Sequence, residues 1–334
     1  MNLARFPRRR YTPGPTPIEK VPRFTAALGG PEIYIKRDDL LGLAAGGNKT
    51  RKLEFLVAEA LSQGADTLIT CGAIQSNHCR LTLAAAAKEG LKCRLVLEER
   101  VPGSYHPQAS GNNFLYRLLG VEQIRVVPGG SDMPQEMEKV AAELAAEGRR
   151  GYLIPGGGSN PVGATGYVAC AQEIQDQTFE QGLVIDTVVC ASGSTGTHAG
   201  LVVGFYGCNL NIPVLGMNVS RPKDLQEELV YSLVQETARH VGVIGGIPRA
   251  AVTCFDDYVG PGYSLPTAAM AEAVRLLART ESILLDPVYT GKTMAGLIDL
   301  VRKGYFKKDS RILFIHTGGS PALYVYEESI LAEP

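Results

Sequence analysis

Short apolar segments rich in β-branched residues alternate with segments of helical periodicity along nearly the whole chain. The apolar segments lack a polar face, which is typical of parallel strands that are covered by helices on both sides of a sheet. The predicted strands are Ile33–Lys36, Thr67–Cys71, Arg94–Leu97, Ile124–Val127, Tyr152–Ile154, Thr187–Cys190, Val214–Val219, Ile283–Leu285 and Ile312–Ile315. This alternation predicts an α/β fold with mostly parallel sheets.

Two of the intervening segments carry a clear apolar stripe. Thr50–Gln63 places Leu53 and Leu56 on one helical face, and Met133–Glu147 does the same with Met137. Both segments are therefore predicted helices. The glycine-rich stretch PGGGSNPVGATG, residues 155–166, interrupts the alternation near the middle of the chain and is a candidate domain crossing or hinge.

Composition narrows the class of protein. The 334 residues suffice for about two domains, and a net charge of −1 without long charged blocks disfavours nucleic-acid binding. No apolar run reaches the roughly 18 residues of a membrane span, and no secretion signal is visible. The seven cysteines are scattered, so we expect buried thiols in a reducing, cytoplasmic compartment, with neither disulfides nor a metal site.

Residues Ser192–Thr197 form the most informative loop. The sequence SGSTGT follows a predicted strand and precedes an apolar helix, where free backbone N–H groups and the helix dipole favour an anion. The loop lacks the order of a P-loop. It partly imitates a dinucleotide fingerprint, but the next strand does not end on the acidic residue that ribose recognition requires. The sequence of this loop is consistent both with a phosphate-binding site and with an ordinary tight turn between a strand and a helix.

Lys49 follows a glycine pair in the sequence GGNKTRK and begins a predicted helix. The positive end of the helix dipole and poor solvation would lower its pKa and favour a nucleophilic amine, which can form a Schiff base. The alternative is an ordinary solvated surface lysine.

Polar residues also follow two other predicted strands. Gln75–His78 comes before an alanine-rich helix, where Ser76 fits an N-cap and the polar groups can bind a small carboxylate. His316–Gly319 closes the last predicted strand, which is also consistent with a simple glycine turn. Tyr263 and Tyr289 lie in loops beside prolines and glycines, and such tyrosines often only pack.

Taken together, these segments resemble one family. IKRDDL, GGNKTRKLEFL, GAIQSNHCR, PGGGSNPVGATGYV, ASGSTGTHAGL, ILLDPVYTGKTMAGLID and HTGGSPALY resemble the fold type II family of pyridoxal-phosphate (PLP) enzymes that holds D-cysteine desulfhydrase, L-cysteate sulfo-lyase and 1-aminocyclopropane-1-carboxylate (ACC) deaminase. The resemblance spans about residues 3–326. It implies a tryptophan synthase β-like fold of two three-layer α/β domains, with residues 1–49 and 161–334 in a large PLP domain and residues 50–160 in a small one. It also implies a homodimer.

The resemblance also implies roles for individual residues. Lys49 would bind PLP covalently, and Thr317 would face the pyridine nitrogen. The other predicted cofactor-binding residues are Asn77, Ser192, Gly193, Ser194, Thr195, Gly196 and Thr197. The predicted substrate-binding residues are Thr50, Ser76, Asn77, His78, Tyr263 and Tyr289. Among these, Ser76, Tyr263 and Tyr289 would join Lys49 as catalytic residues, with Lys49 taking the proton from the substrate Cα.

The implied reaction is an α,β-elimination that converts a cysteine-like amino acid to pyruvate and ammonia. We favour L-cysteate, which releases sulfite, over D-cysteine, which releases hydrogen sulfide. A sulfonate keeps its charge and requires donors or a cation, for which the candidates are Thr50, His78, Arg80, His198 and Arg221. ACC deaminase is a further alternative, but that enzyme carries a glutamate after the catalytic tyrosine, where this chain has Thr290. A nicotinamide-dependent oxidoreductase would leave Lys49, Asn77 and Thr317 without a role.

Overall fold

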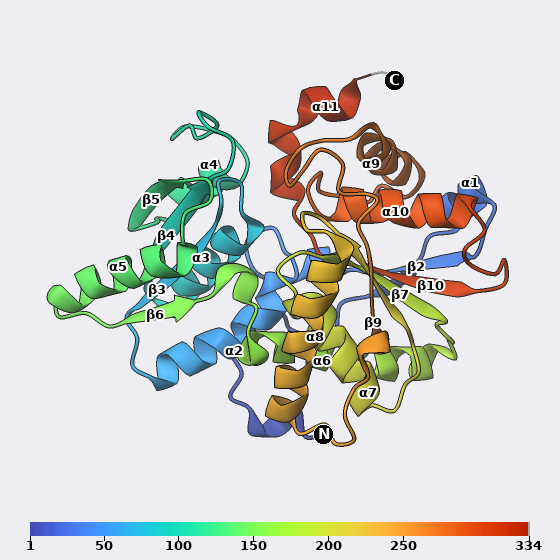
Figure 1. Cartoon of the computed structure of the whole chain (residues 1–334), viewed down its shortest axis with the longest axis horizontal. Helices are drawn as coiled ribbons and strands as arrows, with labels where there is room; N and C mark the ends of the chain where they lie inside the picture. The colour runs from blue at the N-terminus through green and yellow to red at the C-terminus, as the bar shows by residue number, and fades with distance from the viewer. Residues whose placement is uncertain (333–334) are drawn as a thin grey trace.

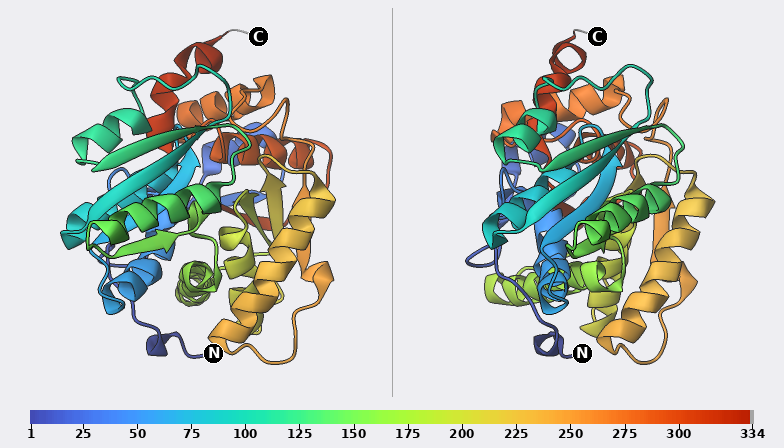
Figure 2. Two further views of the ribbon diagram at one scale, coloured as in Figure 1. Left: turned by 60° about the vertical axis from the view of Figure 1, so that its left-hand side comes forward. Right: turned by 90° about the vertical axis from the view of Figure 1, so that its left-hand side faces the viewer.

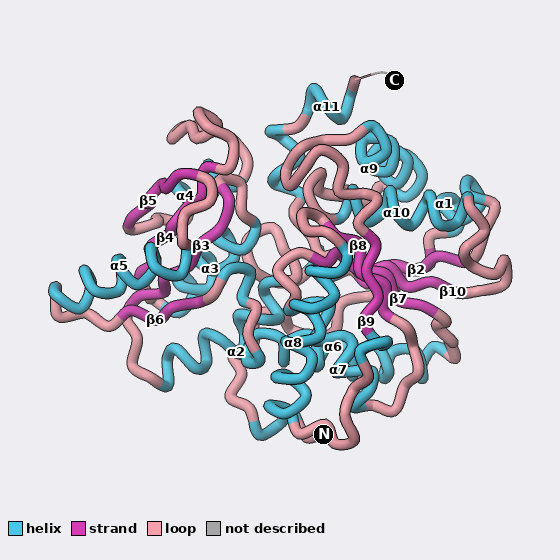
Figure 3. The backbone as a smooth tube through the Cα atoms, viewed as in Figure 1, coloured by secondary structure: helices cyan, strands magenta, loops and turns pink. Residues whose placement is uncertain are grey.

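The computed structural model describes residues 1–332 and contains two separate β-sheets (Figures 1 and 3). The larger sheet has the order β1-β2-β10-β7-β8-β9, and the smaller has the order β5-β4-β3-β6. All strand pairs are parallel except β1 with β2, which are antiparallel. The fold is therefore α/β with mostly parallel sheets, as the pattern of apolar segments predicts.

The strands of the larger sheet come from both ends of the described chain. They are β1 (Ile18–Lys20), β2 (Glu32–Lys36), β7 (Thr187–Ser192), β8 (Val214–Asn218), β9 (Val252–Phe255) and β10 (Arg311–Ile315). The strands of the smaller sheet lie between them in sequence and are β3 (Thr67–Ala73), β4 (Lys92–Glu99), β5 (Gln123–Pro128) and β6 (Gly151–Ile154). The predicted domain boundaries at residues 49/50 and 160/161 fall in the two connections between the sheets, and they stay a prediction.

Helices connect the parallel strands and cover both sheets. They are α1 (Pro22–Leu28), α2 (Lys49–Ser62), α3 (Asn77–Glu89), α4 (Asn112–Leu118), α5 (Met133–Ala146), α6 (Pro161–Gln181), α7 (Gly196–Gly207), α8 (Lys223–Val241), α9 (Ala268–Glu281), α10 (Thr290–Arg302) and α11 (Glu327–Leu331). Short 3-10 helices span Leu3–Arg5, Asp38–Leu40, Gly156–Gly158, Arg249–Ala251 and Ser320–Val325. The two predicted helices with apolar stripes are α2 and α5, within one residue at each end.

Each sheet is the middle layer of three. Val188 of β7 packs into a core with α6, α7 and α8, while the next residue, Val189, packs with α1, α9 and α10 on the opposite face. Figure 1 shows these two groups of helices on the two sides of the larger sheet. In the smaller sheet, Leu68 faces α2 and α3 while Ile69 faces α5. Burial of both faces explains why these strands are apolar throughout.

The segment Ile283–Leu285 is not a strand, contrary to our prediction. It lies in the loop between α9 and α10, where Ser282 ends α9 in the left-handed conformation with φ 58°. Ile283 and Leu285 are buried in the core above the larger sheet, whereas Leu284 is exposed. A loop that packs into the core therefore produced the short apolar run that we read as a strand.

Two short edge strands went unpredicted. β1 has the sequence IEK and pairs only with β2, while β9 pairs only with β8. Edge strands have one unpaired side and need fewer apolar residues, which leaves a weak signal in the sequence. The turned views in Figure 2 bring the smaller sheet, drawn in cyan and green, in front of the larger one.

All seven cysteines are free thiols, and six of them are buried. This agrees with the expectation of buried thiols without disulfides. Within residues 1–332, we find no helix with both the length and the apolarity to cross a membrane.

Candidate active site

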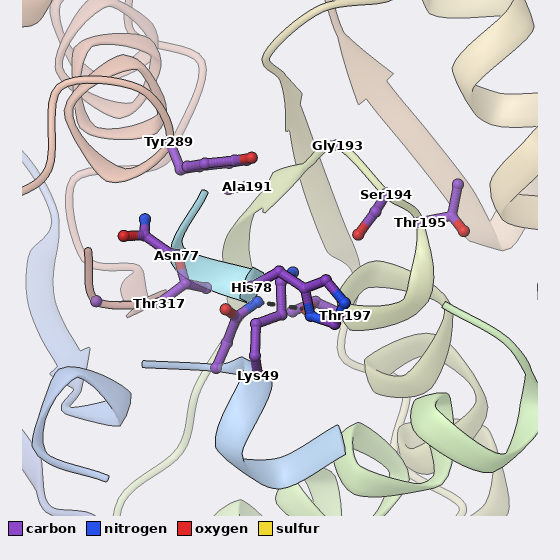
Figure 4. A pocket seen from close by; sticks show the side chains of 12 residues that line it. Lys49, Asn77, His78, Ala191, Gly193, Ser194, Thr195, Thr197, Tyr289 and Thr317 are labelled. Carbon is purple, nitrogen blue, oxygen red and sulfur yellow. Dashed lines mark hydrogen bonds between the residues drawn. The ribbon is translucent and has the colours of Figure 1, made fainter. Parts of the chain in front are cut away.

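Two adjoining cavities lie where the carboxyl ends of strands from both sheets meet. The inner cavity is lined by Asn48, Lys49, Asn77, His78, Ala191, Gly193, Ser194, Thr195, Thr197, Tyr289, Thr317 and Gly318 (Figure 4). The outer cavity shares Lys49, His78, Gly193, Ser194 and Tyr289 with it and adds, among others, Ser76, Glu98, Arg100, Met133, Arg221 and Tyr263. Segments that are far apart in the sequence therefore converge on one site, as expected at the carboxyl edge of parallel sheets.

Lys49 is the first residue of α2 and lines both cavities. The preceding loop requires glycine, because Gly46 and Gly47 have φ values of 65° and 126°. The backbone N–H of Asn48 donates to the Thr317 carbonyl oxygen at 3.0 Å, which ties this loop to the end of β10. Burial lowers the pKa of Lys49 to about 8. A free amine at this position is thus partly neutral near physiological pH, as the sequence predicts, with poor solvation as the cause.

Lys52 is a functional candidate that our sequence reasoning missed. It lies one helical turn after Lys49, is fully buried, and donates from Nζ to the Gly157 carbonyl oxygen at 3.0 Å and to Ser159 Oγ at 3.2 Å. Burial, together with the nearby charge of Lys49, lowers its pKa well below the ordinary value. The i, i+3 spacing of the two lysines was the available signal, because it places them on one helix face.

The loop Ser192–Thr197 connects β7 to α7 and presents its backbone to the inner cavity. Gly193, Ser194, Thr195 and Thr197 line that cavity, and Thr195 has an unusual φ of 76° for a residue other than glycine. A Cβ on Gly196 would lie 2.8 Å from Lys52 Nζ and 2.8 Å from Ser159 Oγ. The loop and the buried Lys52 amine are therefore in close contact.

Ser192 points elsewhere and lines neither cavity. Its Oγ accepts a hydrogen bond from Gln226 Nε2 at 2.9 Å and lies 3.2 Å from His198 Nδ1. Gln226 Nε2 and Arg221 Nη1 also donate to the Gly193 carbonyl oxygen, at 3.1 Å and 2.8 Å. The C=O and the N–H of a trans peptide point in opposite directions. The Ser194 N–H, which shares a peptide with the Gly193 carbonyl, therefore points away from the side chains of Gln226 and Arg221.

The start of α3 supplies the next group of predicted residues. Ser76 is the N-cap, and its Oγ accepts from the Cys79 N–H at 3.1 Å, which confirms the capping interpretation. Asn77 lines the inner cavity, and its Oδ1 accepts from Asn112 Nδ2 at 2.9 Å, so the Asn77 amide group is held in one orientation.

His78 is buried and bonded to the smaller sheet. Its Nε2 lies 2.8 Å from Thr70 Oγ1, and that hydroxyl donates its only proton to the Ile154 carbonyl oxygen at 2.8 Å. Nε2 must therefore carry the proton of the imidazole, which leaves Nδ1 as an acceptor. Burial and the neighbouring charges of Lys49 and Lys52 hold the pKa of His78 well below its usual range, so the ring is neutral.

Tyr263 and Tyr289 meet between the cavities. Their hydroxyl oxygens are 2.5 Å apart and their rings are edge to face, with centroids 5.9 Å apart. Burial raises the pKa of both phenols, and for Tyr289 the neighbouring Tyr263 raises it further. The pair therefore holds its protons at neutral pH and can donate one into the outer cavity.

Two more predicted residues have different surroundings. Thr317 follows β10 and lines the inner cavity, as expected. Thr50 is fully buried on α2 and lines neither cavity, so the structure does not bring it to the predicted site. Of the candidates for holding a sulfonate, Arg80 and His198 likewise lie outside both cavities, whereas Arg221 lines the outer one.

Comparison with known proteins decides the family, because residues 10–318 match the family of pyridoxal-phosphate dependent enzymes. The chain belongs to this PLP-dependent enzyme family. It is 48% identical over 329 residues to a D-cysteine desulfhydrase of Yersinia enterocolitica, and the match covers 98% of each chain. A crystal structure of an ACC deaminase homologue superposes with a TM-score of 0.89 at 40% identity, covering 98% of this chain and 97% of the other.

A solved structure with much lower sequence identity also shares the fold. The structure of an O-ureido-L-serine synthase superposes with a TM-score of 0.67 at 17% identity, over 96% of this chain and 94% of that one. The predicted resemblance to fold type II PLP enzymes is confirmed, and the cofactor is PLP. The match favours PLP over the nicotinamide cofactor that we considered as an alternative.

The inner cavity has the chemistry that this cofactor requires. The Lys49 amine lines this cavity, and the buried Lys52 amine lies against the adjoining loop at Gly196. No carboxylate within residues 1–332 shifts the pKa of either amine. A phosphate group would supply the missing negative charge beside the N–H groups at the start of α7. Lys49 lines both cavities and Lys52 lines neither, which makes Lys49 the candidate amine for a Schiff base.

Proposed function

We propose that this chain is a carbon–sulfur lyase that acts on D-cysteine. The reaction converts D-cysteine and water to pyruvate, ammonia and hydrogen sulfide. The observation that carries the proposal is the 48% identity, over 98% of both chains, to a protein named D-cysteine desulfhydrase. A small amino-acid substrate also suits the outer cavity, where Lys49 faces Tyr263 and Tyr289.

This proposal reverses the preference that we drew from the sequence. The preference for L-cysteate rested on side chains that can hold a sulfonate, whereas full-length similarity to a desulfhydrase favours D-cysteine. The lyase reaction and its products other than the sulfur compound are the same in both cases, so L-cysteate stays the second candidate.

ACC deaminase is disfavoured by the residue after Tyr289. Thr290 is fully buried, and its N–H and Oγ both donate to Asp286 Oδ1 at 2.7 Å. Thr290 lines neither cavity and offers no carboxylate to a substrate. The similarity to a solved ACC deaminase homologue therefore supports a shared fold and cofactor, and the Thr290 environment supports a different reaction.

Lys49 would move the first proton. PLP, when bound, withdraws electrons from the substrate Cα and makes its proton acidic. Because burial lowers the pKa of Lys49 to about 8, its freed amine can accept that proton near neutral pH. His78 stays neutral and already donates its Nε2 proton to Thr70, so it does not compete for the role.

The tyrosine pair would serve the leaving sulfur. With the hydroxyls 2.5 Å apart and both pKa values raised, the pair can donate one proton while the second phenol stabilises the charge that forms. The N-terminus of α3, at Ser76–His78, would hold the substrate carboxylate through its N–H groups. Asn77 and Thr317 would contact the cofactor ring from the inner cavity.

The assay that tests the proposal compares both enantiomers of cysteine and of cysteate. We expect pyruvate and sulfide from D-cysteine, with kcat/KM about tenfold or more above that of every other substrate. A higher kcat/KM for sulfite release from L-cysteate would replace D-cysteine with the second candidate. Failure of all four substrates to yield pyruvate would refute the lyase proposal itself.

A homodimer and a cytoplasmic location complete the proposal. The resemblance to dimeric PLP enzymes supports the dimer, and the seven free, mostly buried thiols suit a reducing compartment. Sedimentation of the holoenzyme at two concentrations would test the dimer.

A further inference from the structure

The two tyrosines of the pair belong to segments that are built differently. Tyr289 directly precedes α10, where Asp286 Oδ2 accepts hydrogen bonds from the Val288 and Tyr289 N–H groups at 3.0 Å and 3.1 Å. Tyr263 lies in the connection between β9 and α9, residues 256–267, which contains neither helix nor strand and which we call the Tyr263 loop. Contacts from outside this loop must therefore hold Tyr263 in place.

The backbone of the Tyr263 loop is unusual on both sides of the tyrosine. Gly260, Gly262 and Ser264 have φ values of 66°, 154° and 64°, and such a value is uncommon for a serine. Gly260 and Pro261 are exposed, so burial does little to fix the tip of the loop. Hydrogen bonds from neighbouring side chains have to supply the missing restraint.

Lys292, on α10, supplies two such hydrogen bonds. Its Nζ donates to the carbonyl oxygens of Val259 at 2.7 Å and of Gly262 at 2.8 Å, and these are its only acceptors among residues 1–332. The lysine is only 1% exposed. Burial lowers its pKa to about 8, so the amine is mostly charged at pH 7. Charge-assisted hydrogen bonds are the strong ones, and a buried ammonium loses free energy when they break.

Two other side chains hold the loop at points on either side. The Tyr258 hydroxyl donates to Asp299 Oδ2 at 2.7 Å, and the Tyr326 hydroxyl donates to the Ser264 carbonyl oxygen at 2.7 Å. Within the described chain, the backbone between these two points receives side-chain hydrogen bonds from Lys292 alone. Lys292 therefore restrains the part of the loop that leads into Tyr263.

The position of Lys292 links the two tyrosines. Lys292 lies three residues after Tyr289, and one of its acceptors is the carbonyl of Gly262, the residue directly before Tyr263. That carbonyl belongs to the planar Gly262–Tyr263 peptide, so the hydrogen bond fixes the orientation of the backbone that carries the Tyr263 side chain. The first turn of α10 thus holds both partners whose hydroxyl oxygens are 2.5 Å apart.

We propose that Lys292 is a positioning residue, which holds Tyr263 against Tyr289 so that the tyrosine pair can donate its proton to the leaving sulfur. The role in turnover rests on the proposed lyase function, whereas the restraint on the loop does not. Lys292 lines neither cavity, so it acts only through the Tyr263 loop. Its removal should loosen this loop and slow turnover while PLP stays bound.

Hydrogen–deuterium exchange of the holoenzyme tests the restraint without turnover. Lys292→Met keeps the length of the side chain and removes both hydrogen bonds, and water can reach the freed carbonyls because the loop tip is exposed. The protein should therefore stay folded. At pH 7 we expect peptides from residues 256–267 to exchange about tenfold faster than in the wild type, while peptides from α10 stay protected. Equal exchange of the loop in both proteins would overturn the proposal.

Kinetic measurements test whether the placement of Tyr263 matters for the reaction. Lys292→Met should lower kcat for D-cysteine about tenfold, and PLP affinity in equilibrium dialysis should not change. Tyr263→Phe should also lower kcat, and combining it with Lys292→Met should cause no further loss, because the lysine serves only the missing hydroxyl. Losses in kcat that multiply in the double variant would overturn the positioning role.

Lys139→Met is the control for loss of a lysine charge. Lys139 is half-exposed on α5, pairs with Glu136 at 2.6 Å and lines neither cavity, so loop exchange and kcat should match those of the wild type.

The two proposals can fail separately. If no substrate yields pyruvate but the Tyr263 loop exchanges faster in Lys292→Met, the lyase function fails and the restraint by Lys292 stands. If Lys292→Met consumes D-cysteine at the wild-type rate, the lyase function stands and the positioning role fails.

Discussion

The two cavities differ in how they are built. The inner cavity is lined mostly by glycines and other small residues, such as Gly193, Ser194 and Thr317. The outer cavity is formed by larger side chains from both sheets, among them Arg100, Tyr263 and Met133. The first arrangement suits one fixed cofactor, and the second allows the substrate to vary. Five residues, Lys49 among them, line both cavities, but variants of residues that line only one cavity should separate cofactor binding from substrate choice.

Lys49→Ala should cause the largest loss. In the proposed mechanism the change removes both the covalent link to PLP and the group that takes the Cα proton, so kcat should fall by about a thousandfold or more. Pyruvate release from D-cysteine measures the effect. Activity within tenfold of the wild type would remove Lys49 from the mechanism.

Gly196→Val should act on the inner cavity alone. A Cβ there would lie 2.8 Å from both Lys52 Nζ and Ser159 Oγ, whose flexible ends can move aside without unfolding the protein. Displacing Lys52 from the Ser192–Thr197 loop should weaken PLP binding about 10- to 100-fold, if this loop holds the PLP phosphate as proposed. Equilibrium dialysis against PLP would measure this. Gly14→Val is the matched control, because nothing lies within 4 Å of that position.

Tyr289→Phe should leave PLP binding intact and slow turnover. The hydroxyl bonds only to Tyr263 among the described residues, so the fold should hold, and loss of a proton donor should lower kcat about 10- to 100-fold. Tyr305→Phe, a change at an exposed tyrosine outside both cavities, should have no effect. Unchanged kcat in Tyr289→Phe would reduce this tyrosine to a packing role.

The smallest effect concerns the stability of the protein without PLP. The pKa of Lys49 falls from 10.5 in the unfolded chain to about 8 in the folded one, so between these pH values the unfolded state binds more protons. The free energy of unfolding should therefore rise with pH across this window, by roughly 3 kcal/mol from Lys49. Denaturant unfolding of the apoprotein, compared with Lys49→Met, isolates this contribution. Identical pH slopes in both proteins would contradict it.

The sequence was most informative where one local segment forms a functional unit. Lys49 after its glycine pair, and the Gly193–Thr197 loop before α7, each carry their signal within a few residues, and the structure brings them together. The outer cavity was harder to predict, because the contact between Arg100 and Tyr263 joins two sheets and leaves no local pattern.

Two other predictions show a further limit. Thr50 neighbours Lys49 in sequence, but the 100° step of a helix turns it into the core. Ile283–Leu285 has the apolar run of a buried strand because Ile283 and Leu285 pack into one core with α9 and α10. In both cases tertiary packing determined the environment, and a single sequence does not reveal it.

The account rests on Lys49 as the residue that binds PLP, and borohydride reduction of the holoenzyme tests it most directly. Reduction fixes a Schiff base as a stable bond, after which proteolysis and mass spectrometry identify the modified lysine. We predict one phosphopyridoxyl group, on Lys49, and none on the neighbouring Lys52. Modification of Lys52 or of any other lysine in place of Lys49 would contradict the account.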